Sequence, residues 1–215
     1  MTSELISSMT NLVVSTPIPE SVVLTKTKGD GAGGKNTNLY GKKFEELTNN
    51  EEQLFVKGYK KTLITSTKSK NGYYLSKTVA DKEITFVIQG GLKLYMEKEY
   101  NIKLFRCPDE AYIVKRLNDP TRHVLKILEK KEQHVDGSVE TKLWSGVALK
   151  REYELMCPDF EICYAFCLSS FLKDKFNSED KKYKVLNQIF KENNIEVFFG
   201  EDADYFEKIN EWIQK

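Results

Sequence analysis

The fold of this chain is decided by the stretch FRCPDEAYIVKRLNDPTRHVLKILEKKEQ at residues 105–133. The turn-like LNDPT at 117–121 separates two short segments that are rich in Val, Ile, Leu and aromatic residues, a pattern that predicts two strands of a β-hairpin. If this hairpin folds symmetrically about Asp119, then Asp109 and Glu129 face each other with Cβ atoms roughly 5 Å apart. The hairpin is therefore expected to bring two carboxylates to one point.

Alternation along the second strand assigns its side chains to two faces. With a period of two, Leu125, Ile127, Glu129 and Lys131 share one face and Lys130 points to the other. The shared face is apolar at one end and charged at the other, which favours the mouth of a cleft over a solvated surface. We therefore expect the Lys131 ammonium group beside the two carboxylates.

Three further polar residues belong to the same hairpin. Glu110 and Glu132 fall on the alternate faces of their strands, and both are expected to be solvated. Gln133 extends the charged face to E-x-K-x-Q and is a secondary catalytic candidate. Its expected role is to order a water molecule or to contact a phosphate group.

Two carboxylates this close repel each other unless a proton or a divalent cation lies between them. Hard oxygen ligands in this number suit Mg²⁺, which keeps several waters for chemistry, so Asp109 and Glu129 are the expected metal ligands. Bound Mg²⁺ lowers the pKa of a coordinated water and offsets charge on a phosphoryl oxygen, while Lys131 can orient the attacking water or stabilise the transition state. Phosphodiester hydrolysis needs these parts.

A family resemblance points to the same chemistry. PDEAYI followed by ILEKKEQ resembles the Pro-Asp, then Asp/Glu-x-Lys signature of the PD-(D/E)XK nuclease superfamily, with Asp109, Glu129 and Lys131 in its three core positions. The segments GAGGKNTNLYGKKFEELT, LFRCPDEAYI and EKKEQHVDGSVETKLWSG are together similar to type II restriction endonucleases of that superfamily. This similarity covers most of the chain, about residues 30–170.

The resemblance implies a fold and an activity. The fold is α/β, restriction-endonuclease-like, with a central mixed β-sheet flanked by helices, and the mixture of strands and helices along the chain indicates the same class. The activity is Mg²⁺-dependent, sequence-specific cleavage of double-stranded DNA, with Glu45 as an additional acid that the residues alone do not separate from Glu46. Because the two antiparallel strands must be cut at phosphates related by a dyad, a homodimer is expected.

Eight polar residues are candidates for DNA contact, because such side chains bind phosphate oxygens and position the duplex. They come from the glycine-rich loop 29–38, the basic segment 58–82 and the helix expected after the hairpin: Lys35, Asn36, Asn38, Lys61, Lys68, Lys70, Lys142 and Arg151. The segment 58–82 fits a DNA-facing hairpin or a solvated loop equally well. For Trp144, a core position is favoured over a base-stacking platform.

The 215 residues fit a single nuclease domain at 29–215, preceded by an irregular N-terminal arm at 1–28. No stretch approaches the roughly 20 apolar residues that span a membrane, and the N-terminus lacks the basic region of a signal peptide. An intracellular location, in a bacterial cytoplasm or a virus-infected cell, is therefore expected. The cysteines form no Cys-x-x-Cys pair and are expected to be buried free thiols: Cys107, Cys157, Cys163 and Cys167.

The net charge of +1 and the pI of about 7.6 argue against a strongly basic DNA-binding protein. This argument is weak for a nuclease, because the carboxylates of a metal site cancel basic residues elsewhere in the sum.

Hydrophobic periodicity predicts the remaining elements. Strands are expected at 84–89, 161–170 and 195–199, and helices at 91–101, 136–156 (with Ser138 as N-cap), 181–193 and 202–213. A further helix is expected to begin near residue 39, with Leu39, Phe44 and Leu47 directed inward.

Three other functions stay open. The loop GDGAGGKN at 29–36 nearly matches the phosphate-binding pattern G-x-x-x-x-G-K-[ST], but Asn36 stands where a hydroxyl is needed, so a P-loop NTPase is disfavoured. A repair or junction-resolving nuclease of the same superfamily would share the candidate site. A non-catalytic DNA-binding module would need only the fold, yet Asp109, Glu129 and Lys131 are all intact.

Overall fold

The computed structural model describes residues 37–65, 72–134, 137 and 139–215. The N-terminal arm 1–28, most of the glycine-rich loop, and four named candidates lie outside these residues: Lys35, Asn36, Lys68 and Lys70. The helix cap expected at Ser138 also lies outside them.

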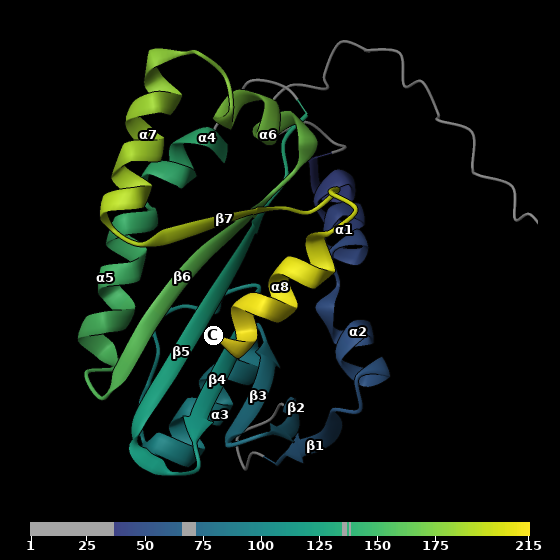
Figure 1. Cartoon of the computed structure of the whole chain (residues 1–215), viewed down its shortest axis with the longest axis vertical. Helices are drawn as coiled ribbons and strands as arrows, with labels where there is room; N and C mark the ends of the chain where they lie inside the picture. The colour runs from purple at the N-terminus through teal and green to yellow at the C-terminus, as the bar shows by residue number, and fades with distance from the viewer. Residues whose placement is uncertain (1–36, 66–71, 135–136, 138) are drawn as a thin grey trace, which may run out of the picture.

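A seven-stranded sheet forms the centre of the molecule, with its strands in the order of the sequence (Figure 1). The first five strands pair antiparallel, whereas β5, β6 and β7 run parallel to one another. The strands are β1 (Lys60–Ile64), β2 (Gly72–Val79), β3 (Lys82–Ile88), β4 (Glu110–Arg116), β5 (Asp119–Lys131), β6 (Phe160–Leu168) and β7 (Ile195–Phe199).

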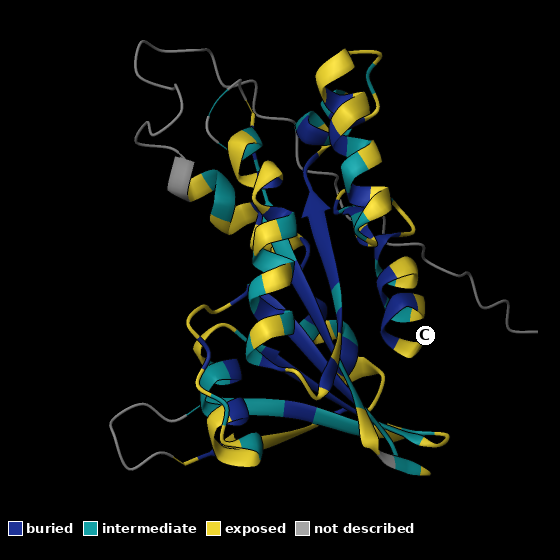
Figure 2. Ribbon diagram, turned by 90° about the vertical axis from the view of Figure 1, so that its left-hand side faces the viewer, coloured by how far each residue is buried: buried dark blue, intermediate teal, exposed yellow. Residues whose placement is uncertain are grey.

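Helices cover both faces of this sheet. They are α1 (Thr37–Leu47), α2 (Asn50–Val56), α3 (Gly90–Tyr100), α4 (Val139–Trp144), α5 (Gly146–Met156), α6 (Ser170–Phe176), α7 (Lys181–Glu192) and α8 (Tyr205–Gln214). The helices α3 to α7 contribute to the apolar core on one face, and α1, α2 and α8 contribute to the core on the other. Figure 2 shows the buried strands between helices whose outer sides are exposed. The expected α/β class with a mixed sheet flanked by helices is therefore confirmed.

The hairpin has the expected register. Glu110 pairs with Leu128 and Lys115 with His123, so continuing the ladder by one residue sets Asp109 opposite Glu129. The turn itself is displaced from the predicted centre at Asp119, because the register shifts after Lys115 and the chain reverses between β4 and β5 at residues 117–118. A bulge in β5 absorbs the extra residues and leaves the register of the site end unchanged.

The single helix predicted at 136–156 is wrong, because the segment forms α4 and α5 with a break at Ser145. After the break, the start of α5 lies close against β6, since a Cβ atom on Gly146 would come within 2.7 Å of the Phe166 ring. The hydroxyl of Ser145 donates to the carbonyl of Lys142 at 2.7 Å and satisfies an acceptor at the end of α4.

Several burial predictions are also wrong. Phe44 is buried, but Leu39 and Leu47 are exposed, so α1 packs through a narrower apolar stripe than its sequence indicates. Trp144 is 37% exposed and is not a core residue. The helix α6 was not expected at all.

The four cysteines are free thiols, as expected. Cys157 and Cys167 are buried and Cys163 is partly buried, whereas Cys107 is exposed, so its expected burial is wrong. Among the described residues, no helix combines the length and the apolar character that crossing a membrane requires.

Candidate active site

Asp109, Glu129 and Lys131 converge where β4 begins and β5 ends. The Nζ atom of Lys131 lies 2.6 Å from Glu129 Oε2 and 3.7 Å from Asp109 Oδ2. The main-chain N–H of Lys130 donates to that same Asp109 oxygen at 2.7 Å. All three side chains are largely withdrawn from solvent, with exposed fractions of 17–25%. The juxtaposition expected from strand alternation is therefore present.

Partial burial sets the electrostatics of this cluster. Burial raises the pKa of Glu129; the neighbouring Lys131 opposes this shift and the Asp109 carboxylate adds to it. Burial outweighs the charge of Lys131 here, so further positive charge from a bound metal ion would stabilise the ionised Glu129 carboxylate.

A cleft beside Asp109 contains more acidic residues. It has a volume of about 230 Å³ and is lined by residues of α1, α2, the end of β3 and the hairpin, among them Lys42, Glu45, Glu46, Asp109, Glu110 and Lys130. Glu129 and Lys131 are not among the described residues that line it, so Asp109 joins the cleft to the cluster.

Glu45 is electrostatically connected to this cluster. Burial raises the pKa of Glu45 and the charge of Asp109 raises it further, whereas Lys130, Lys131 and Lys42 lower it. Glu46 lines the same cleft. The helix α1 therefore brings an acidic side chain towards Asp109, as the resemblance implies. That Glu45 or Glu46 is a metal ligand stays a prediction.

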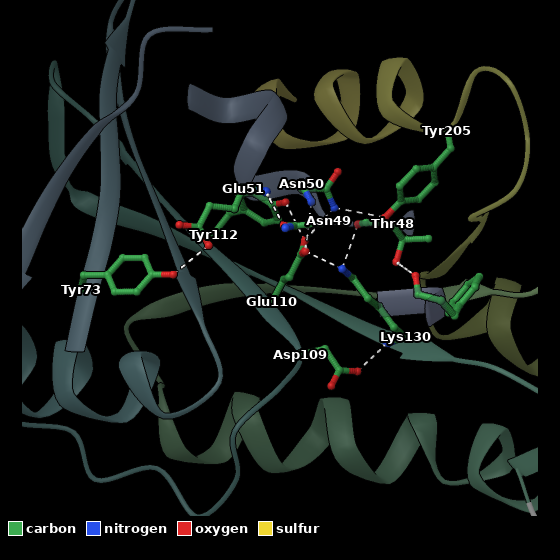
Figure 3. Close-up of polar contacts among 11 residues, drawn as sticks. Thr48, Asn49, Asn50, Glu51, Tyr73, Asp109, Glu110, Tyr112, Lys130 and Tyr205 are labelled. Carbon is green, nitrogen blue, oxygen red and sulfur yellow. Dashed lines mark hydrogen bonds and ion pairs between the residues drawn. The ribbon is translucent and has the colours of Figure 1, made fainter. Parts of the chain in front are cut away.

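The opposite face of the hairpin end carries a second polar network, which Figure 3 shows. Lys130 Nζ lies 2.6 Å from Glu110 Oε1 and also donates to the carbonyl of Thr48 at 2.8 Å. Glu110 Oε2 accepts from Asn50 Nδ2 at 2.7 Å and from the hydroxyl of Tyr112 at 3.0 Å. Only 3% of the Glu110 side chain is exposed, so its expected solvation is wrong: both faces of this strand are covered by helices.

The two residues after β5 also differ from expectation. Glu132 is not solvated: its side chain is 8% exposed and lies 2.5 Å from His134 Nε2. Burial raises the pKa of Glu132. The strand β5 ends at Lys131, so the prediction of a continuous E-x-K-x-Q strand face is wrong. Gln133 is buried, and the hydroxyl of Ser169 accepts from its main-chain N–H and donates to its main-chain carbonyl. A catalytic role for Gln133 stays a prediction.

Sequence analysis also missed Arg106, in the segment that leads into β4. Arg106 Nε bonds Glu152 Oε2 at 2.9 Å, and its charge lowers the pKa of Glu129. The signal available in the sequence was the position of an arginine three residues before Asp109, but its partner on α5 comes from tertiary packing.

The described DNA-contact candidates lie on several elements. Lys61 is exposed on β1 with its ammonium group 3.5 Å from the centre of the Tyr73 ring, and β1 and β2 form a hairpin within the basic segment. Lys142 is exposed on α4, and exposed Arg151 on α5 pairs with Glu154 at 2.8 Å. Asn38 lies in α1. Whether any of them contacts DNA stays a prediction.

The donor set fits Mg²⁺ in its chemistry. Within the described ranges no three His, Cys, Asp or Glu residues come together as a metal cage. Mg²⁺ does not need such a cage, since it is commonly bound by one or two carboxylates and completes its shell with water and substrate oxygens. Asp109 and Glu129 supply two carboxylates, and the carbonyl of Lys130, 3.1 Å from Lys131 Nζ, is a neutral oxygen beside them.

Comparisons with known protein families, with curated proteins and with solved structures found no match to this chain. A function for the chain therefore has to be argued from the geometry of its own residues.

Proposed function

We propose that this chain is a Mg²⁺-dependent, sequence-specific endonuclease of double-stranded DNA, with the character of a type II restriction enzyme of the PD-(D/E)XK superfamily. The observation that carries the proposal is the approach of Asp109 and Glu129 to the Nζ atom of Lys131 at the end of the β4–β5 hairpin. Two hard oxygen ligands beside a fixed ammonium group are the parts that metal-assisted phosphodiester hydrolysis uses.

Each residue of the cluster has a defined role in this proposal. Asp109 and Glu129 hold Mg²⁺, which when bound polarises the scissile phosphate and acidifies a coordinated water. Lys131 orients the attacking water, and its positive charge offsets the negative charge that develops in the transition state. The hydrogen bond from the Lys130 main chain keeps the Asp109 carboxylate in place before substrate binds, which lowers the entropic cost of assembling the site.

Cleavage of a sequenced plasmid in the presence of Mg²⁺, followed by mapping of the DNA ends, tests the proposal. We expect discrete double-strand cuts at one short sequence. An Asp109→Asn variant purified in parallel serves as the control, because a contaminating nuclease would cut in both samples. Equal cutting by the two proteins would therefore refute the assignment.

The same assay separates the alternatives. Cleavage of branched DNA, with linear duplexes left intact, would favour a repair or junction-resolving nuclease. Metal-independent DNA binding with no cleavage of any substrate would favour a non-catalytic DNA-binding module.

The proposed active species is a homodimer within the cell. One subunit offers one Asp109–Glu129–Lys131 site, but two antiparallel strands with scissile phosphates related by a dyad require two sites. Sedimentation with a cognate duplex should give two protomers for each duplex and a palindromic or nearly palindromic target. A complex of one protomer with one duplex that only nicks an asymmetric site would contradict the dimer.

A further inference from the structure

The buried pair of Glu110 and Lys130 lies directly behind the candidate metal site. Glu110 follows Asp109 in the chain, and Lys130 precedes Lys131 in β5, so each residue of the pair is the sequence neighbour of a residue of the cluster. Their side chains leave the strands on the opposite face and lie 2.6 Å apart, with 3% and 5% of their surfaces exposed. The pair and the cluster are thus the two sides of one strand end.

The network also fixes the junction between α1 and α2. Lys130 Nζ donates to the carbonyl of Thr48, which follows α1, and Glu110 accepts from the side chain of Asn50, which begins α2 (Figure 3). Thr48 is also joined to α1, because its hydroxyl donates to the carbonyl of Phe44 at 2.7 Å. The last turn of α1, which carries Glu45, is therefore tied to the hairpin through Lys130.

Lys130 makes contacts on both sides of the sheet. Its side chain bonds Thr48 and Glu110, while its main-chain N–H donates to Asp109 Oδ2 and its carbonyl accepts from Lys131 Nζ. Lys130 thus joins the buried network to the candidate metal site through its own hydrogen bonds. A displacement of this residue would move the Asp109 carboxylate and the Lys131 ammonium group together.

Stability alone is a poor explanation for such a pair. Taking two charges out of water carries a large desolvation cost, and an apolar pair of similar volume is often neutral or more stabilising. The same face already holds an apolar core that includes Tyr112 and Leu128, so the network replaces apolar packing that the position could accommodate. What the ion pair adds is a fixed geometry, since its hydrogen bonds allow one arrangement of α1 against the hairpin.

We propose that Glu110 and Lys130 are positioning residues that hold the Asp109 and Glu45 carboxylates in the geometry of the metal site. This inference rests on the proposed function, because it assigns the two residues to the same metal-dependent reaction. Neither residue needs to touch DNA or metal through its side chain. Partners of metal ligands in other proteins have effects of about 10–100-fold on metal affinity or activity.

The double variant Glu110→Gln with Lys130→Met tests the proposal without leaving a buried charge unpaired. The glutamine side chain keeps an acceptor for Asn50 and Tyr112, and the methionine removes the ammonium link to Thr48. The matched control is Lys126→Met. Lys126 is a buried lysine on the same face of β5, but its Nζ bonds the carbonyl of Trp212 in α8 at 2.5 Å, whereas that of Lys130 bonds the carbonyl of Thr48 after α1.

Three measurements are made on wild type and both variants: Mn²⁺ affinity by electron paramagnetic resonance without DNA, metal-free DNA binding, and the single-turnover cleavage rate as a function of Mg²⁺. The double variant should bind Mn²⁺ about 10-fold or more weakly and require correspondingly more Mg²⁺, with metal-free DNA binding unchanged. Lys126→Met should match wild type in all three, whatever its thermal stability.

The outcomes separate the two proposals. A double variant with wild-type Mn²⁺ affinity and Mg²⁺ dependence would overturn the positioning role, and so would an equal loss in Lys126→Met, which would mark a general effect of removing a buried lysine. If wild-type protein binds Mn²⁺ but cuts no DNA, the nuclease proposal fails, and the Mn²⁺ affinities of the same three proteins still decide the positioning role.

Discussion

The main-chain N–H of Lys130 donates a 2.7 Å hydrogen bond to Asp109 Oδ2, one residue beyond the last pair of the β4–β5 ladder. A carboxylate held by the backbone depends on the position of residue 130 in β5, to which the bonds of the Lys130 side chain with Thr48 and Glu110 contribute, and not on the charge of the carboxylate itself. The charge of Asp109 and its position can therefore be tested separately.

Asp109→Asn should remove cleavage while leaving the fold and metal-free DNA binding intact, and Glu129→Gln should do the same. Asparagine still offers an oxygen to the Lys130 N–H, so the variant removes a negative metal ligand without removing the hydrogen bond. We expect rates at least about 100-fold below wild type in single-turnover assays, because the metal supplies much of the transition-state stabilisation. Cutting by either variant at more than about a tenth of the wild-type rate would show that the metal ligands are assigned wrongly.

Lys131→Ala should slow bond cleavage more than it weakens DNA binding. A single positioned cation that acts on the transition state is typically worth about 100-fold or more in rate. A suitable control is Lys184→Ala, since Lys184 is an exposed residue of α7 that pairs with Glu179 on the surface. A variant that loses DNA affinity but cleaves bound DNA at the wild-type rate would place Lys131 in substrate binding instead.

The raised pKa of Glu129 predicts a pH-dependent stability in the absence of metal. Burial is the main cause, so the folded state holds this proton more tightly than the unfolded chain, whose carboxyl titrates near the ordinary value of 4.5. The free energy of unfolding should therefore fall as pH rises from about 4.5 to the raised pKa and stay level above it.

Comparing wild type with Glu129→Gln isolates this titration. The glutamine variant should be the more stable protein at neutral pH, and the difference should vanish below about pH 4.5, where Glu129 is protonated in both states. Urea unfolding at a series of pH values in a chelating buffer measures it. A wild-type protein that gains stability relative to the variant as pH rises would mean that Lys131 outweighs burial at this site.

The arrangement of Asp109, Glu129 and Lys131 was accessible from sequence because it depends on local rules. A period of two assigns Glu129 and Lys131 to one face, and a hairpin register follows from the turn and the apolar pattern together. The bulge after Lys115 moved the turn but preserved that register, so the prediction of Asp109 opposite Glu129 holds at the site end.

The Glu110–Lys130 network was not accessible in the same way. Its partners Thr48 and Asn50 lie about 60 or more residues away in the chain and reach the hairpin only through the packing of α1 and α2. The sequence did hold one overlooked signal. Tyr112 and Leu128 share the face of Glu110 and are apolar, which is typical of a strand that is buried on both faces and not of one with a solvated side.

Two glycine substitutions test whether the position of α1 controls the candidate site. A Cβ atom on Gly200, which follows β7, would clash with Thr48 Cγ2 and lie 2.8 Å from Phe44 Cζ, so Gly200→Ala should push the end of α1 away from the sheet. Such overpacking costs about 1–3 kcal/mol of stability. Because Glu45 lies in the displaced turn, the variant should also require more Mg²⁺ for cleavage.

Gly41→Ala is the matched control within α1 itself. A Cβ atom there meets nothing within 4 Å, and alanine in a helix interior is favoured over glycine by about 0.5–1 kcal/mol, so this variant should gain stability in urea unfolding and keep the wild-type Mg²⁺ requirement. If Gly200→Ala loses stability but keeps that requirement too, the last turn of α1 does not contribute to the metal site, and Glu45 loses its proposed role while Asp109, Glu129 and Lys131 keep theirs.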